Sequence, residues 1–160
     1  MHTKSSNTTE VGNAFRDAVA SVLRTKYADV RTEVLVGHKK VDIVYTYVDF
    51  GRRVTVGVEC KFEAAPLKKD DIRTKIWSDY QPLVGKHLDL VVIVARKDIN
   101  AVARAYVDEI SALRFQTYEQ FEDSLIGLND YVSQLLSFTK FMTTDSLLVR
   151  YTVITLKGDS

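Results

Sequence analysis

The sequence lacks the features of disulfide-stabilised, cysteine-ligated and membrane-spanning proteins. Its 160 residues include one cysteine, Cys60, which excludes an intrachain disulfide and a zinc site built from cysteines. The longest aliphatic run, Leu90 to Ala95, has six residues, whereas a helix that crosses a bilayer needs roughly 20. Met1 to Thr9 is polar and has no apolar core typical of a signal peptide. We therefore expect a cytoplasmic protein with no membrane partner.

What the chain does have is the composition of a globular domain. Hydrophobic residues make up 46% and charged residues 27%, which argues against disorder, collagen and coiled coil. The formal net charge of +1 argues against a strongly basic nucleic-acid-binding protein. The charge is unevenly distributed, because residues 1–100 carry an excess of four positive charges while five basic and eight acidic residues follow from Arg104 onward. Any phosphate-binding face should therefore lie in the first hundred residues.

Hydrophobic periodicity predicts a mixed β-sheet flanked by helices, in the α/β (α+β) class. The predicted helices are Asn7–Arg24, Asp70–Leu83, Asp98–Ile110 and Tyr118–Ile126. The predicted strands are Arg31–Gly37, Lys40–Val48, Arg53–Phe62, Leu88–Ala95 and Leu113–Thr117. The order is αβββαβαβ with αβββαβ as its core, and the short links between the first three strands predict an antiparallel meander.

The domain boundary is expected near Gly127, where the pattern changes. We assign residues 1–128 to the domain with the mixed sheet and residues 129–160 to a C-terminal helix and strand. A lone strand needs a partner for its backbone hydrogen bonds. The tail is therefore either an extra layer on the domain or the first piece of a following domain.

Candidate chemistry lies at the end of the third strand, in Glu59-Cys60-Lys61. Residues two apart in a strand share a face, so the Glu59 carboxylate and the Lys61 ammonium lie together. A turn centred between Phe50 and Gly51 would place Asp42 directly opposite Glu59, with Cβ atoms about 5 Å apart. Lys61 would then be the diagonal neighbour of Asp42, whereas a register slip of one residue would separate these side chains.

Two opposed carboxylates destabilise a sheet unless something compensates their charge. A divalent cation such as Mg²⁺ or Mn²⁺ would do so, and it could polarise a phosphodiester. Lys61 would then hold or help deprotonate the attacking water and stabilise developing negative charge. The ordinary alternative is a solvated sheet face with Lys61 as an ion-pair partner. The apolar residues around Asp42, from Val41 to Tyr45, favour the functional interpretation.

At these positions the sequence resembles the PD-(D/E)XK, or restriction-endonuclease-like, nuclease superfamily. Its hallmark is an Asp near one strand and Glu-x-Lys on the next, after a helix that carries another Glu in some members. Here these positions read Val41-Asp42, Glu59-Cys60-Lys61 and Glu10, and the resemblance covers about residues 7–126. The chain departs from the pattern at Val41, which stands where the superfamily's name has proline. A glutamine motif seen in some branches has no clear match.

The resemblance implies a metal-dependent endonuclease that hydrolyses DNA phosphodiester bonds. It makes Asp42, Glu59 and Lys61 catalytic, with Asp42, Glu59 and Glu10 as ligands of Mg²⁺ or Mn²⁺. Glu10 has an equally good interpretation as the capping-box residue of a helix with Asn7 as its N-cap. Domains of this kind commonly act as homodimers or as the effector part of larger restriction, recombination or antiviral defence proteins.

Basic residues around the predicted site are candidates for contacts with the nucleic-acid backbone. They are Lys39, Lys40, Lys68, Lys69 and Arg73. RNA is an alternative substrate, because no visible feature reads a 2′-hydroxyl. The main alternative function is a catalytically inactive module that keeps the fold for nucleic-acid binding or protein assembly. A further alternative is an unrelated α/β interaction domain in which the three residues coincide by chance.

Overall fold

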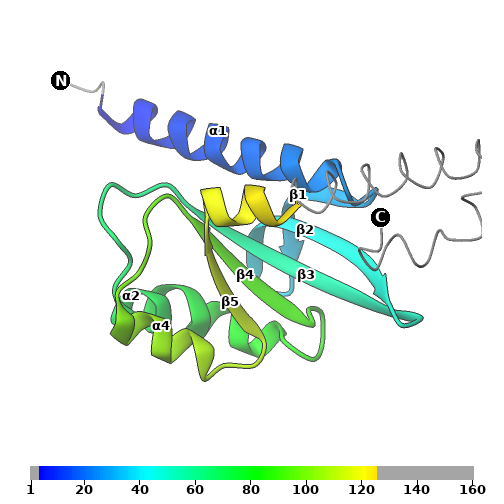
Figure 1. Cartoon of the computed structure of the whole chain (residues 1–160). Helices are drawn as coiled ribbons and strands as arrows, with labels where there is room; N and C mark the ends of the chain where they lie inside the picture. The colour runs from blue at the N-terminus through cyan, green and yellow to red at the C-terminus, as the bar shows by residue number, and fades with distance from the viewer. Residues whose placement is uncertain (1–3, 126–160) are drawn as a thin grey trace, which may run out of the picture. The chain divides into compact units, whose positions relative to one another are not determined.

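The protein, seen in a computed structural model that describes residues 4–125, contains a five-stranded mixed sheet with helices on both faces (Figure 1). Its main elements are α1 (Lys4–Arg24), β1 (Val30–Val36), β2 (Lys39–Asp49), β3 (Arg52–Lys61), β4 (Leu90–Ala95), α4 (Ala101–Asp108) and β5 (Leu113–Thr117). Residues 118–125 are helical. The predicted element order is confirmed over these residues, whereas the helix and strand expected in 129–160 lie outside them.

The strands lie in the order β1-β2-β3-β4-β5. The first three form the predicted antiparallel meander, and β4 and β5 then run parallel to β3. The two parallel connections each contain helical segments, because parallel strands need a crossover connection, which is usually helical. In Figure 1, α1 lies over one face of the sheet, and α2 and α4 lie over the other.

The turn between β2 and β3 has two residues, Phe50 and Gly51, between the paired residues Asp49 and Arg52. Both central residues have positive φ, at 46° and 79°, which is the geometry that matches the twist of a tight hairpin. The pairing continues to Ile43 opposite Val58, so the predicted register is confirmed over these residues.

The segment between β3 and β4 is helical from Lys69 to Leu83, close to the predicted Asp70–Leu83, but it is not one regular helix. It consists of α2 (Lys69–Asp71), the π-helix η1 (Ile72–Trp77), α3 (Ser78–Tyr80) and the 3₁₀ turn η2 (Gln81–Leu83). Pro82 lies in η2, where its missing backbone N–H costs little at a helix end. None of the described helices is long and apolar enough to cross a membrane.

The core under this segment positions an aromatic side chain against the sheet. Ile72, Ile76 and Tyr80 are fully buried in a cluster with Val91 and Ile93 of β4. Gly57 of β3 makes room for them, since a Cβ there would meet a Leu88 methyl carbon at 2.9 Å and the Tyr80 ring at 3.5 Å. The absence of a side chain at residue 57 therefore lets Tyr80 lie close to β3.

Candidate active site

Asp42 lies where β2 separates from β3. The backbone pairing of the two strands ends at Ile43 and Val58, one pair short of Asp42 and Glu59. In place of a backbone pair, the Cys60 N–H donates a 2.8 Å hydrogen bond to Asp42 Oδ2. At this end of the strand pair, β2 is therefore linked to β3 through the Asp42 carboxylate and not through the Asp42 main chain.

The surroundings of Asp42 disfavour its charged form. Burial and the nearby Glu59 carboxylate raise the pKa of Asp42, against the opposing effects of the Cys60 N–H, Lys61 and Lys39. Asp42 and Glu59 are therefore close enough to repel each other. An added cation between or beside them would relieve that repulsion.

Glu59 of β3 is the buried charged residue of the described chain, with 6% of its surface exposed. The Tyr80 hydroxyl donates a 2.6 Å hydrogen bond to its Oε2, and Lys61 Nζ lies 3.0 Å from its Oε1. Lys39 Nζ lies 3.4 Å from Oε2 on the other side. Burial acts to raise the pKa of Glu59, but Lys61, Tyr80 and Lys39 outweigh it and hold the pKa below its ordinary value.

Lys61, at the end of β3, is half-buried beside Glu59. Burial favours its neutral form, yet the charges of Glu59 and Asp42 outweigh that effect and raise the pKa of Lys61. The Lys61 side chain is therefore an ammonium at neutral pH. A small cavity of about 40 Å³ adjoins it, lined by Lys61, Glu63, Leu67, Asp71, Lys75 and Ile76.

Two residues of this site had other interpretations in the sequence. Tyr80 fits the helical spacing of Ile72 and Ile76, so its pattern indicates a core residue, and only the fold shows its hydroxyl on Glu59. Lys39 was expected to contact nucleic acid from the surface. Its ammonium instead lies within the site, 4.7 Å from the centre of the Tyr80 ring and 3.8 Å from Asp79 Oδ2.

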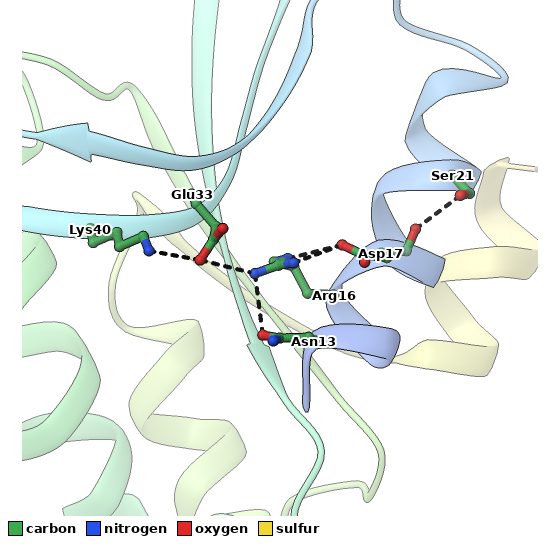
Figure 2. Close-up of polar contacts among 6 residues, drawn as sticks. All are labelled: Asn13, Arg16, Asp17, Ser21, Glu33 and Lys40. Carbon is green, nitrogen blue, oxygen red and sulfur yellow. Dashed lines mark hydrogen bonds and ion pairs between the residues drawn. The ribbon is translucent and has the colours of Figure 1, made fainter. Parts of the chain in front are cut away.

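Helix α1 brings a cation, Arg16, toward Asp42. Arg16 Nε and Nη2 donate to Asp17 Oδ1, and Nη1 contacts Asn13 Oδ1 and Glu33 Oε1, as Figure 2 shows. Burial opposes the charged guanidinium, but the carboxylates of Asp17, Glu33 and Asp42 raise the pKa of Arg16 above its ordinary value. No sequence pattern indicates this role, because Arg16 has the spacing of an ordinary polar helix residue.

Glu10 does not join the two carboxylates in a recognisable metal site. It is exposed on α1, and the part of the chain that the structure describes contains no group of three or more His, Cys, Asp or Glu side chains placed to hold a metal ion. The alternative interpretation of Glu10 as a capping-box residue is wrong. Helix α1 begins at Lys4, so Asn7 lies inside the helix and cannot be its N-cap.

The other basic candidates have partners of their own. Lys40 Nζ is 2.7 Å from Glu33 Oε1, and Arg73 Nη2 is 3.0 Å from Asp70 Oδ1. Lys69 Nζ lies 5.6 Å from the centre of the Tyr106 ring. Lys68, just before α2, lines an open groove with Pro66 and Asn100. This groove is at the carboxyl ends of β3 and β4, where ligands commonly bind in open α/β sheets.

The donor set of Asp42 and Glu59 suits a hard divalent cation. One or two protein carboxylates are enough for Mg²⁺ when water and substrate phosphate complete its shell. Because lysines and a tyrosine already contact both oxygens of Glu59, a bound cation would replace at least one of the lysine contacts.

No protein-family model matches the sequence, and no curated protein matches it. Two solved structures are similar in fold. A protein of unknown function, AF1548, has a TM-score of 0.50 and 18% identity over 64% of this chain and 56% of its own. The DNA modification-dependent restriction endonuclease AspBHI has a TM-score of 0.48 and 12% identity over 68% of this chain and 29% of its own. The chain thus spans little more than half of the first and under a third of the second.

Proposed function

We propose that the chain is a metal-dependent nuclease domain of the restriction-endonuclease-like type that hydrolyses DNA phosphodiester bonds. The observation that supports it best is the meeting of Asp42, Glu59 and Lys61 on two adjacent strands, with the carboxylate of Glu59 buried. Burying a charge is costly unless it is paired, and such groups cluster at functional sites.

In this proposal Asp42 and Glu59 hold Mg²⁺ or Mn²⁺. The bound ion supplies Lewis-acid stabilisation of phosphate charge and a more acidic water. Lys61 contacts Oε1 and Lys39 contacts Oε2 of Glu59, so the bound ion would displace at least one of these lysines from the carboxylate. Because the two carboxylates are already held in place, they would orient the ion without having to rearrange during the reaction.

Lys61 acts in this proposal as a charged donor. The carboxylates of Glu59 and Asp42 raise the pKa of Lys61, which favours an ammonium that orients water and stabilises developing negative charge. The adjoining cavity of about 40 Å³ has room for water, which needs roughly 10 to 15 Å³ per molecule.

DNA would approach along the groove that Lys68 lines, with Lys39, Lys40, Lys69 and Arg73 as the further candidates for phosphate contact. Asp70 forms an exposed ion pair of little net energy with Arg73, which phosphate can replace. A homodimer, or a larger assembly in restriction or antiviral defence, belongs to the same proposal.

One observation favours the second candidate, a catalytically inactive module for nucleic-acid binding or assembly. Glu59 is already neutralised by Lys39, Lys61 and Tyr80, so the site is stable without a metal ion. The inactive module would therefore bind DNA but not Mg²⁺.

The deciding experiment measures cleavage of plasmid, linear DNA and RNA by the purified chain with Mg²⁺, Mn²⁺ or EDTA, beside calorimetry of Mg²⁺ binding. Glu59→Gln and Lys61→Ala are the test variants. Glu109→Gln and Lys86→Ala are matched controls, because both residues are exposed and Lys86 precedes β4, whose other end lies beside Lys61.

We expect metal-dependent nicking of DNA that both test variants lose and both controls keep. Lost activity with preserved DNA binding would assign the two residues to catalysis. Absence of both cleavage and Mg²⁺ binding would replace the proposal with the inactive module, and cleavage of RNA alone would change its substrate.

A further inference from the structure

The pairing of β1 with β2 is interrupted at one position, Glu33 opposite Asp42. The pairs on either side, Thr32 with Ile43 and Val34 with Val41, have the same register, but Glu33 and Asp42 do not pair. Glu33 has a φ of 54°. A residue with a Cβ rarely adopts this left-handed conformation, and within a strand it breaks the ladder. Asp42 is therefore without a backbone pair toward β1 as well as toward β3.

The interruption also shifts the faces of β2. Val41 and Val44 belong to the same core cluster, although residues three apart in a regular strand point to opposite faces. The alternation therefore slips by one residue between them. Asp42 lies at this slip, which lets its carboxylate turn to the Cys60 N–H.

Two cations hold the Glu33 side chain in place. Lys40 Nζ is 2.7 Å and Arg16 Nη1 is 3.2 Å from Glu33 Oε1, so α1, β1 and β2 meet at this carboxylate (Figure 2). The Arg16 side chain is only 13% exposed and is itself oriented by Asn13 and Asp17. The left-handed residue is thus fixed from the helix and from the neighbouring strand.

We infer that Glu33, held by Arg16 and Lys40, is the positioning residue for Asp42. With Glu33 left-handed, Asp42 leaves both ladders and its carboxylate faces the end of β3. With an extended residue at 33, the ladder would close and draw Asp42 back into regular pairing. The consequence for catalysis rests on the proposed function, whereas the geometry of Asp42 does not.

The direct test is a mutant cycle read by NMR on the full chain. Replacing Asp42 with Asn changes the acceptor of the Cys60 N–H, so the Cys60 amide resonance should move strongly in the wild-type background. A β-branched residue resists positive φ. In a Glu33→Val background the same Asp42→Asn change should therefore move the Cys60 amide by roughly a third of that amount or less.

Two further backgrounds separate the backbone from the ion pairs. Glu33→Gly keeps the left-handed conformation accessible and should restore most of the wild-type response. Arg16→Gln combined with Lys40→Gln leaves residue 33 unchanged and should reduce the response to about half. Arg31→Gln is the matched control, because Arg31 lies on the same strand as Glu33, and its loss removes only an exposed ion pair with Asp29 and should leave the response unaltered.

Calorimetry of Mg²⁺ supplies the second readout. Groups that orient metal ligands typically change metal affinity by 10- to 100-fold, so Glu33→Val should weaken Mg²⁺ binding by about tenfold. The inference is overturned if Asp42→Asn moves the Cys60 amide resonance by the full wild-type amount in folded Glu33→Val or in the Arg16→Gln/Lys40→Gln variant. If that movement is reduced as expected but the wild-type chain does not bind Mg²⁺, the inference stands and the proposed function is rejected.

Discussion

Glu59 combines burial with a lowered pKa, and these two properties oppose each other. Desolvation alone would favour the neutral acid, so the donors around the carboxylate must more than compensate. Tyr80 and Lys39 act on Oε2, and Lys61 acts on Oε1. Each donor therefore has a separable effect that a single substitution can measure.

Tyr80→Phe removes one hydroxyl and keeps the packing of the ring. A hydrogen bond to a charged group contributes about 1.5 to 3 kcal/mol, so we expect the free energy of unfolding to fall by about 1 to 2 kcal/mol, with Lys39 compensating in part. Urea denaturation at pH 7 measures this change in the free energy of unfolding. Tyr106→Phe on α4 is the control, and equal stability of the two variants would show that the 2.6 Å contact contributes nothing.

Lys39→Met removes a cation that competes with metal for Glu59. Methionine is an unbranched apolar side chain that can still pack against the Tyr80 ring, while the charge 3.4 Å from Oε2 and 4.7 Å from the ring centre is lost. Mg²⁺ affinity should rise by about fivefold, equivalent to roughly 1 kcal/mol. Calorimetry against Lys86→Met tests this, and weaker binding would assign Lys39 a supporting and not a competing role.

At the scale of elements, the start of β4 is tied to β3 by Asp89. Its carboxylate accepts hydrogen bonds from the Thr55 N–H and from Arg52, both at 2.8 Å. The Thr55 hydrogen bond and Arg52 hold the pKa of Asp89 below its ordinary value of 3.8. A carboxyl whose folded pKa is depressed contributes stability above its unfolded pKa and loses it as the pH falls through the folded value.

Asp89→Asn should therefore be less stable than wild type at pH 7, and the difference should shrink as the pH falls below about 4. Urea denaturation at pH 7, 4 and 3 gives the comparison. A difference that stays constant over this range would mean that the Asp89 charge makes no contribution to the link between β3 and β4.

The β2–β3 hairpin contains a residue poorly suited to its turn. Phe50 has a φ of 46° and is fully exposed, so it bears the cost of a left-handed conformation without packing that offsets it. Asn-Gly is the preferred pair in this turn, and Phe50→Asn should raise the free energy of unfolding by about 0.5 to 1 kcal/mol. Phe50→Val should lower it, and a reversed order of the two variants in urea would contradict the turn assignment.

The hairpin also shows how far the sequence predicts this structure. Alternating apolar residues and the Asp49-to-Arg52 turn were sufficient for the register of β2 with β3, because both are local signals. The break at Glu33 and Asp42 was not predictable, since no local pattern marks it and the Arg16 that contacts Glu33 lies 17 residues earlier in the chain. The Tyr80 hydroxyl on Glu59 and the π-helical turn before it likewise depend on tertiary packing.

At the scale of the whole molecule, the charges nearly cancel, with 22 basic and 21 acidic residues. A near-neutral protein has little long-range attraction for DNA, so the DNA binding that we propose would depend on local clusters. Lys68 and Lys69 are exposed beside the groove at the carboxyl ends of β3 and β4. Lys86 precedes β4, at the opposite ends of these parallel strands.

These positions predict a local salt dependence of DNA binding. Each phosphate contact contributes about 0.9 to the slope of log affinity against log salt concentration, so Lys68→Gln/Lys69→Gln should reduce the slope by about 1.8. Fluorescence anisotropy with Ca²⁺ in place of Mg²⁺ measures binding apart from cleavage. Lys86→Gln should leave the slope unchanged, because it neutralises the same kind of charge away from the groove. An equal loss in Lys86→Gln would mean that net charge governs binding, and an unchanged slope in the double variant would place the DNA on another face.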